Sequence, residues 1–151
     1  MPRFSTAPNS LTPTVGIYSF GVKGNITPKC QFTVDVTKFR DPSGQKQFKN
    51  LNGIDPEVRD WVGEDARMAG VVENCLLIAD DLLKPKAVAD GEKTTVAPAS
   101  AWLSIAFKDH HGRWAAPAVA ELVAEALSKA GFTVATTHYG LKEADGKPVV
   151  L

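Results

Sequence analysis

The sequence predicts an α/β fold with three layers, in which a mainly parallel sheet of four strands is flanked by helices. Strand patterns alternate with amphipathic helical patterns along the 151 residues, an order typical of parallel sheets. In addition, residues 101–107 are almost continuously apolar, as in a central strand that is buried on both faces. A chain of this length is expected to form one domain that folds without a metal or a disulfide.

The first elements are an arm, two strands and a polar loop. Residues 1–13 contain three prolines and are expected to form an extended arm outside the core. Residues 14–21 have the β-branched and aromatic content of a strand, which ends at Gly21. In residues 31–39 apolar and polar side chains alternate, which predicts a second strand half covered by helices. A long polar loop then runs to Gly53.

Two helices are predicted in the middle of the chain. Asp55 has the residue type of an N-cap and Pro56 suits the first helical position, so the first helix begins there. A stripe of apolar side chains spaced three or four residues apart predicts a second helix over residues 66–84, which Pro85 ends. Residues 84–93 are then predicted to form a surface loop.

The rest of the chain contains two strands and one helix. The buried strand at 101–107 leads through the charged loop 108–114 into a helix over 115–130, with Gly131 as its C′ residue. Residues 132–140 form the last predicted strand. The expected divisions of the chain are residues 1–13 for the arm, 14–141 for the domain and 142–151 for a tail.

The charges balance overall but not locally. There are 17 basic and 17 acidic residues, which argues against a protein that coats nucleic acid through bulk charge. Residues 23–49 nevertheless contain six basic residues against two acidic ones, and residues 55–92 contain ten acidic residues against four basic ones. This polarity is compatible with one face that attracts a polyanion, and equally with solvated loop charges.

The cysteines and the apolar segments indicate the compartment. Cys30 and Cys75 form no CxxC pair, and the N-terminus lacks the pattern of a signal peptide. Asp80, Asp81 and Lys84 interrupt the longest apolar run, which is too short to cross a bilayer. We therefore expect a cytoplasmic protein with two free thiols and no membrane contact.

The stretch "FKDHHGRWAAP", residues 107–117, follows a strand and precedes a helix, which is where α/β proteins bind ligands. A helix N-terminus attracts anions, a glycine allows backbone amides to converge, and an arginine binds phosphate with two donors. Loops after neighbouring strands meet at this edge of the sheet. The expected anion-binding residues are Lys23, Lys38, Arg40, His110, His111, Gly112 and Arg113.

Other chemistries have weaker support. A metal site formed by Asp109, His110, His111 and His138 is disfavoured because adjacent histidines on a loop rarely bind one ion together. The sequence has no GxxxxGK[ST] motif, and no Ser/His/Asp set or carboxylate pair can be identified by spacing. We therefore expect neither an enzyme nor a bound metal or cofactor.

Five segments together resemble a known family. They are "YSFGVKG" at 18–24, "VDVTKFRDP" at 34–42, "LNGIDPEVRDWV" at 51–62, "LSIAF" at 103–107 and "AVAELVAEALSKAGFTVATTH" at 118–138. In this order and spacing, residues 14–141 resemble the C-terminal domain of the RNase adapter protein RapZ. This resemblance implies a fold like that of a sugar-phosphate-binding subdomain of phosphofructokinase, a domain that senses glucosamine-6-phosphate, and binding of a small regulatory RNA.

The resemblance is incomplete at the ligand loop. In the family, the strand similar to residues 103–107 is followed by a Gly-Cys-Thr-Gly-Gly loop and then by a basic residue, His, Arg and Ser. Here Gly112 and a basic residue at Arg113 are retained, whereas Asp109 replaces the family cysteine. Thr37 stands where an arginine is usual. These differences alter the phosphate site that the family resemblance implies.

We expect a standalone regulatory module that binds RNA or a phosphorylated, amino-sugar-phosphate-like ligand. The alternative is a protein-interaction module that kept the fold and lost the ligand site, and an enzyme acting on a phosphate ester is the least favoured hypothesis. Because RapZ relatives assemble, a homo-oligomer in which the arm packs on a neighbouring subunit is also expected. A free-standing domain of this kind would suit a bacteriophage or actinobacterial genome.

Overall fold

The computed structural model describes residues 14–24, 26–84, 86–90, 93–97 and 102–151. Within these residues, five strands form one sheet in the order β2-β5-β1-β6-β7. The first four strands in this order run parallel, and the last runs antiparallel to its neighbour. Their bounds are β1 Thr14–Gly21, β2 Phe32–Asp35, β5 Trp102–Asp109, β6 Thr133–Lys142 and β7 Pro148–Val150.

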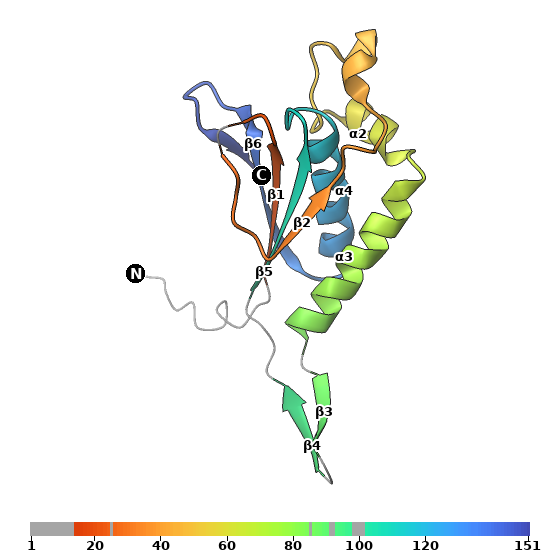
Figure 1. Ribbon diagram of the computed structural model, residues 1–151, viewed down its shortest axis with the longest axis vertical. Coiled ribbons are helices and arrows are strands. Elements are labelled where there is room, and N and C mark those ends of the chain that lie inside the picture. The colour runs from red at the N-terminus through yellow and green to blue at the C-terminus, as the bar shows by residue number, and fades with distance from the viewer. Residues whose placement is uncertain (1–13, 25, 85, 91–92, 98–101) are drawn as a thin grey trace.

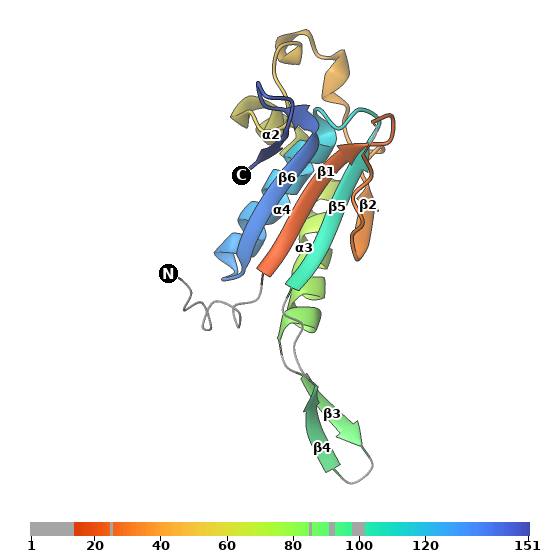
Figure 2. The same cartoon turned by 90° about the vertical axis from the view of Figure 1, so that its left-hand side faces the viewer.

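Three helices lie on one face of this sheet (Figures 1 and 2). They are α2 Pro56–Gly63, α3 Arg67–Leu83 and α4 Ala115–Lys129. The connection between β1 and β2 runs over the opposite face, close to β5 (Figure 1). The predicted α/β class with a mainly parallel sheet and flanking helices is confirmed. None of the helices in the described part of the chain is long and apolar enough to cross a membrane.

The core lies between the sheet and α4. Successive strand residues point to opposite faces, so β1 directs Val15 and Ile17 toward the helices, and β5 directs Leu103, Ile105 and Phe107 the same way. The alanine-rich sequence of α4 allows this helix to pack on β1, β5 and β6 and against α2 and α3. Its buried side includes the predicted residues Ala120, Val123, Ala124 and Leu127.

Several predicted boundaries are confirmed. Helix α2 begins at Pro56, α3 spans almost the predicted range, and Gly131 follows α4 with a φ of 100°, the left-handed conformation that a C′ glycine supplies. Asp55, however, does not cap the amides of α2 with its side chain. Its Oδ2 instead accepts a hydrogen bond from the backbone N–H of Asn52 at 2.8 Å.

Three predictions are wrong. Residues 84–93 are not simply a loop, because Lys86–Asp90 (β3) pairs antiparallel with Lys93–Ala97 (β4). The strand predicted over 31–39 ends at Asp35, where the chain turns toward two short 3₁₀ segments, η1 Pro42–Gly44 and η2 Lys46–Phe48. The sheet has five strands and not four, because part of the predicted tail forms β7. The predicted arm, residues 1–13, lies outside the described residues.

A buried polar network joins β1, β6 and α4. His138 and Ser19 are fully buried, and Nδ1 of His138 lies 2.6 Å from Oγ of Ser19. On its other side, Nε2 of His138 lies 2.7 Å from Oε2 of Glu121. Burial raises the pKa of Glu121, but the hydrogen bond and charge of His138, together with smaller contributions from Thr136 and Arg59, outweigh this effect and hold the pKa below its ordinary value. The network therefore stabilises the ionised form of Glu121.

We predict that Glu121→Gln flattens the acid side of the stability profile. A carboxylate whose pKa is lowered by folding adds stability above its unfolded pKa and loses this contribution as the pH falls through its folded pKa. Urea denaturation at several pH values should therefore show a weaker loss of unfolding free energy below about pH 4 for the variant than for the wild type. Glu125→Gln, on the exposed side of the same helix, is the control. Identical profiles for Glu121→Gln and the wild type would contradict the prediction.

Candidate ligand-binding site

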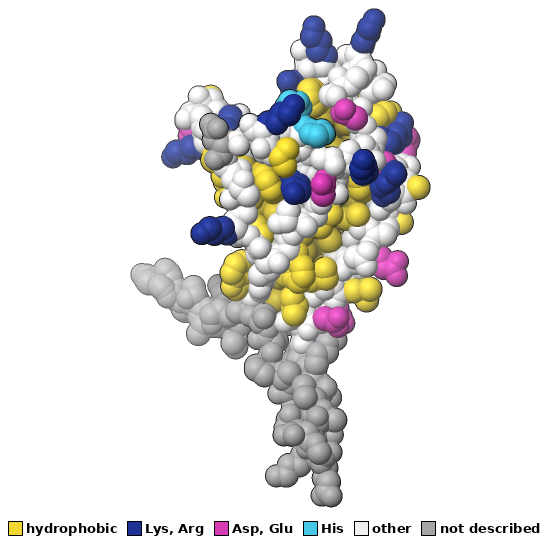
Figure 3. All heavy atoms as spheres, viewed as in Figure 1, with side chains coloured by type: hydrophobic (Ala, Val, Ile, Leu, Met, Phe, Trp, Pro, Cys, Tyr) yellow, Lys and Arg dark blue, Asp and Glu magenta, His cyan; other side chains and the backbone are white. Residues whose placement is uncertain are grey.

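Three parallel strands end side by side and direct their following loops to one edge of the sheet. In the register, Gly21 lies opposite Asp109 and Asp35 lies opposite Lys108. The pairing continues into the loops, because the backbone N–H of Lys23 donates to the carbonyl of His110 at 3.1 Å. Figure 3 shows histidine, lysine and arginine side chains gathered at the end of the molecule that carries these loops.

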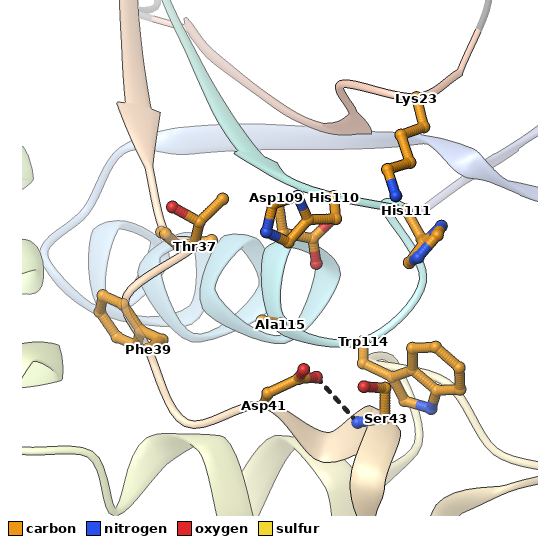
Figure 4. A pocket seen from close by; sticks show the side chains of 11 residues that line it. Lys23, Thr37, Phe39, Asp41, Ser43, Asp109, His110, His111, Trp114 and Ala115 are labelled. Atoms are coloured by element: carbon orange, nitrogen blue, oxygen red, sulfur yellow. Dashed lines mark hydrogen bonds between the residues drawn. The ribbon is translucent and has the colours of Figure 1, made fainter.

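These loops enclose a cavity of about 190 Å³. Figure 4 shows Lys23 and His111 on one side of the cavity and Asp41 and Ser43 on the other. Lys23, His110 and His111 are thus three of the seven predicted residues that line one site. The complete lining is Lys23, Val36, Thr37, Phe39, Asp41, Ser43, Asp109, His110, His111, Trp114 and Ala115.

The carboxylate of Asp109 occupies the position where the amides of the loop and of α4 converge. One carboxylate oxygen accepts from the backbone N–H of Gly112, and the other accepts from the backbone N–H of Ala116 at 3.0 Å. The residue is only 9% exposed. Burial raises the pKa of Asp109, although hydrogen bonds from Ala116 and Gly112 act in the opposite direction. The anion nest expected in this loop is therefore filled by the chain's own carboxylate.

Glycines allow the loop to pass close to two strands. Gly112 has a φ of 72°, a conformation that favours glycine. A Cβ atom on Gly140 would lie 2.2 Å from the carbonyl oxygen of Gly112, so a side chain there would displace the loop. Gly112 is buried and has a structural role here, whereas it was predicted to contribute to an anion nest.

The remaining predicted cations lie outside the cavity. The guanidinium of Arg40 stacks on Trp61 at 3.8 Å and donates to the carbonyl of Trp61 and to Glu64, at 3.0 and 2.9 Å. Lys38 is exposed and does not line the cavity. Arg113 donates from Nη2 to the carbonyl of Lys49 at 2.9 Å and stacks on Trp114 at 4.5 Å.

The arrangement of the four residues of the alternative metal site gives that hypothesis no support. His138 is tied to Ser19 and Glu121 in the buried network, and the Asp109 carboxylate is taken up by backbone amides. Among the described residues, no group of three or more His, Cys, Asp or Glu side chains is arranged to hold a metal ion.

Sequence reasoning missed five residues that contribute polar atoms or rings to the cavity. Thr37 and Phe39 belong to the end of the predicted strand, which lies beyond the observed β2. Asp41 and Ser43 follow the predicted strand, and Trp114 ends the ligand loop. The segment Asp41-Pro42-Ser43 carries a turn signal, since the Asp41 side chain accepts from the backbone N–H of Ser43 at 2.9 Å. A turn directly after a parallel strand could therefore have been assigned to the same edge of the sheet.

We predict that Asp109→Ala lowers the free energy of unfolding by about 2 kcal/mol, because two backbone N–H groups lose their acceptor. Asp109→Asn, which keeps one acceptor oxygen, should have an intermediate effect. Urea denaturation followed by circular dichroism measures both changes. Asp60→Ala, at an exposed position on α2, should change stability by less than about 0.5 kcal/mol. An equal loss for Asp60→Ala and Asp109→Ala would disprove the role given to Asp109.

Comparison with known proteins agrees with this fold. Residues 13–142 match the RapZ C-terminal domain family. The chain is 31% identical over 136 residues to a nucleotide-binding protein of Zymomonas mobilis, an alignment that covers 89% of this chain and 39% of that protein. It is 29% identical over 128 residues to one of Cereibacter sphaeroides, covering 85% and 39% respectively. A protein of the same description in Sphingopyxis alaskensis is 28% identical over 151 residues, covering 97% and 45%.

The chain thus spans about two fifths of the length of the curated relatives that it matches. These relatives are proteobacterial, and they give no support to the expected phage or actinobacterial source. The family match extends from the start of β1 to the end of β6 and includes the three loops that form the cavity. The chain belongs to the RapZ C-terminal domain family.

Proposed function

We propose that this chain is a regulatory module that binds a small phosphorylated ligand, of the amino-sugar-phosphate type, in the cavity at the carboxyl ends of β1, β2 and β5. One observation carries the proposal. A lysine and two histidines line the cavity together with two hydroxyl groups and two carboxylates, of which only that of Asp41 is not already engaged by amides of the loop and of α4. The cavity therefore offers partners for an anion and, separately, for amine and hydroxyl groups of the same molecule.

The phosphate would bind through side chains. Because Asp109 already accepts hydrogen bonds from the amides at the start of α4, these amides are not available to a ligand. Lys23 supplies a positive charge, and its backbone is held beside His110. Imidazole rings donate a hydrogen bond in either protonation state, so His110 and His111 add donors on the same side.

The opposite part of the cavity suits the rest of such a ligand. Asp41 can accept from an ammonium group, and Thr37 and Ser43 can exchange hydrogen bonds with hydroxyl groups. The rings of Phe39 and Trp114 provide apolar surface. A volume of about 190 Å³ lies below the roughly 300–1,000 Å³ typical of pockets for drug-sized ligands, and this favours a ligand the size of a monosaccharide.

Family membership supports the same ligand class, since the resemblance implies a domain that senses glucosamine-6-phosphate. The relatives in Zymomonas mobilis and Cereibacter sphaeroides are described as nucleotide-binding proteins, which favours phosphorylated ligands in general. RNA, the other predicted ligand, is too large for this cavity and would need further cations along its backbone.

We predict that Lys23→Ala weakens binding of glucosamine-6-phosphate at least about tenfold, which corresponds to the loss of one charge-assisted hydrogen bond. Binding is measured by isothermal titration and by the rise of Tm with ligand concentration. Glucosamine and inorganic phosphate are titrated separately, and each should bind more weakly than the combined molecule. Lys38→Ala removes an exposed lysine outside the cavity and should leave the affinity unchanged.

Two results would count against this proposal. Equal affinities for Lys23→Ala and the wild type would exclude the cavity as the binding site. The absence of any Tm shift with all three compounds would favour the alternative of a protein-interaction module.

A further inference from the structure

A second cavity adjoins the first and has a different charge. It measures about 540 Å³, and Ser43 and Trp114 line both cavities. Three cationic side chains line the second cavity, together with the amides of Gln45 and Asn50. They are Lys46, Lys49 and Arg113. No carboxylate lines it, whereas Asp41 and Asp109 line the first cavity.

Arg113 is held in place before any ligand arrives. Its Nη2 donates to the carbonyl of Lys49 at 2.9 Å, and its guanidinium lies over the Trp114 ring at 4.5 Å. The indole nitrogen of Trp114 in turn lies 3.3 Å from the carbonyl oxygen of Phe48, to which it donates. A fixed guanidinium loses less side-chain entropy on binding than a free one, and its planar donors match phosphate oxygens.

The two lysines have no counter-ion within the described part of the chain. Neither Lys46 nor Lys49 forms an ion pair with a described residue, and both are exposed. Three like charges around one hollow repel one another, and a bound anion would relieve this repulsion.

We propose that Lys46, Lys49 and Arg113 form a second phosphate-binding site, separate from the first cavity. Its ligand is a phosphate group carried by a free nucleotide or by a single-stranded RNA. The side-chain amides of Gln45 and Asn50 supply neutral hydrogen-bonding groups beside the cations, and the Trp114 ring offers apolar surface at the boundary with the first cavity. The site does not depend on the identity of the ligand in the first cavity.

The experiment compares two probes, AMP and a ten-residue oligouridylate, by isothermal titration at two salt concentrations. The test variants are Lys46→Ala/Lys49→Ala and Arg113→Lys, of which the second keeps the charge and loses the planar donors. Lys38→Ala is the control for an exposed lysine outside both cavities. Lys23→Ala reports on the first cavity alone. Circular dichroism and the Tm of each variant establish that it is folded.

At least one probe should bind the wild type, and Lys46→Ala/Lys49→Ala should weaken that binding at least about tenfold. Arg113→Lys should also weaken it, while Lys38→Ala and Lys23→Ala should not. If RNA is the source of the phosphate, each lost phosphate contact should reduce the slope of log K against log salt concentration by about 0.7. The double variant, which loses two contacts, should therefore reduce the slope by about 1.4. If a free nucleotide is the source of the phosphate, AMP should bind, and the oligouridylate should bind no more tightly than AMP.

Three outcomes would overturn the proposal. They are no binding of either probe by the wild type, unchanged binding by the double lysine variant, and an equal loss in Lys38→Ala, which would indicate unspecific charge attraction. A loss caused by Lys23→Ala alone would place the phosphate in the first cavity, so that the second site would be refuted while the proposed function would stand.

Discussion

The Asp109 carboxylate holds together the part of the molecule on which both cavities depend. Asp109 is the last residue of β5, and its carboxylate accepts one hydrogen bond from the loop at Gly112 and another from α4 at Ala116. It thereby fixes the path of the chain between strand and helix. The same loop presents the carbonyl of His110 to Lys23 and carries Arg113 and Trp114. An internal carboxylate thus determines where the side chains that line the cavities lie, and it also accepts from the amides that an external anion would otherwise bind.

This arrangement separates two tasks that a glycine-rich phosphate loop combines. Backbone amides here serve stability, and both proposed anion sites consist of side chains on either side of Trp114. The first cavity mixes both signs of charge, because Lys23 faces Asp41 across it (Figure 4). The second is lined only by cations and neutral groups. A mixed cavity favours a zwitterionic molecule, and a cationic one favours phosphate itself.

Local sequence signals predicted much of the fold, and side-chain partners distant in sequence account for most of what they missed. The sequence signals for β1, α2 and α4 are local, so these elements could be recognised. The signals are the pattern of side chains along each element, Pro56 at the start of α2 and Gly131 directly after α4. The convergence of Lys23 with His110 and His111 followed from the rule that parallel strands end at one edge. Arg40 could not be placed, since its orientation depends on Trp61 and Glu64, more than twenty positions away. The role of the Asp109 carboxylate as an acceptor for backbone N–H groups could not be predicted either, because in the sequence Asp109 is only a charged residue in a polar stretch.

In the chain, the β3–β4 hairpin precedes the amino end of β5 and forms a two-stranded sheet of its own, whereas both cavities lie at the carboxyl ends of the strands (Figures 1 and 2). An affinity tag, a fluorophore or a surface anchor attached to this hairpin would therefore stand far from the ligand-binding loops. The domain could be immobilised there as a sensing element, with its two cavities directed into solution. Attachment through the loop at 44–50 would instead cover the lysines of the second cavity.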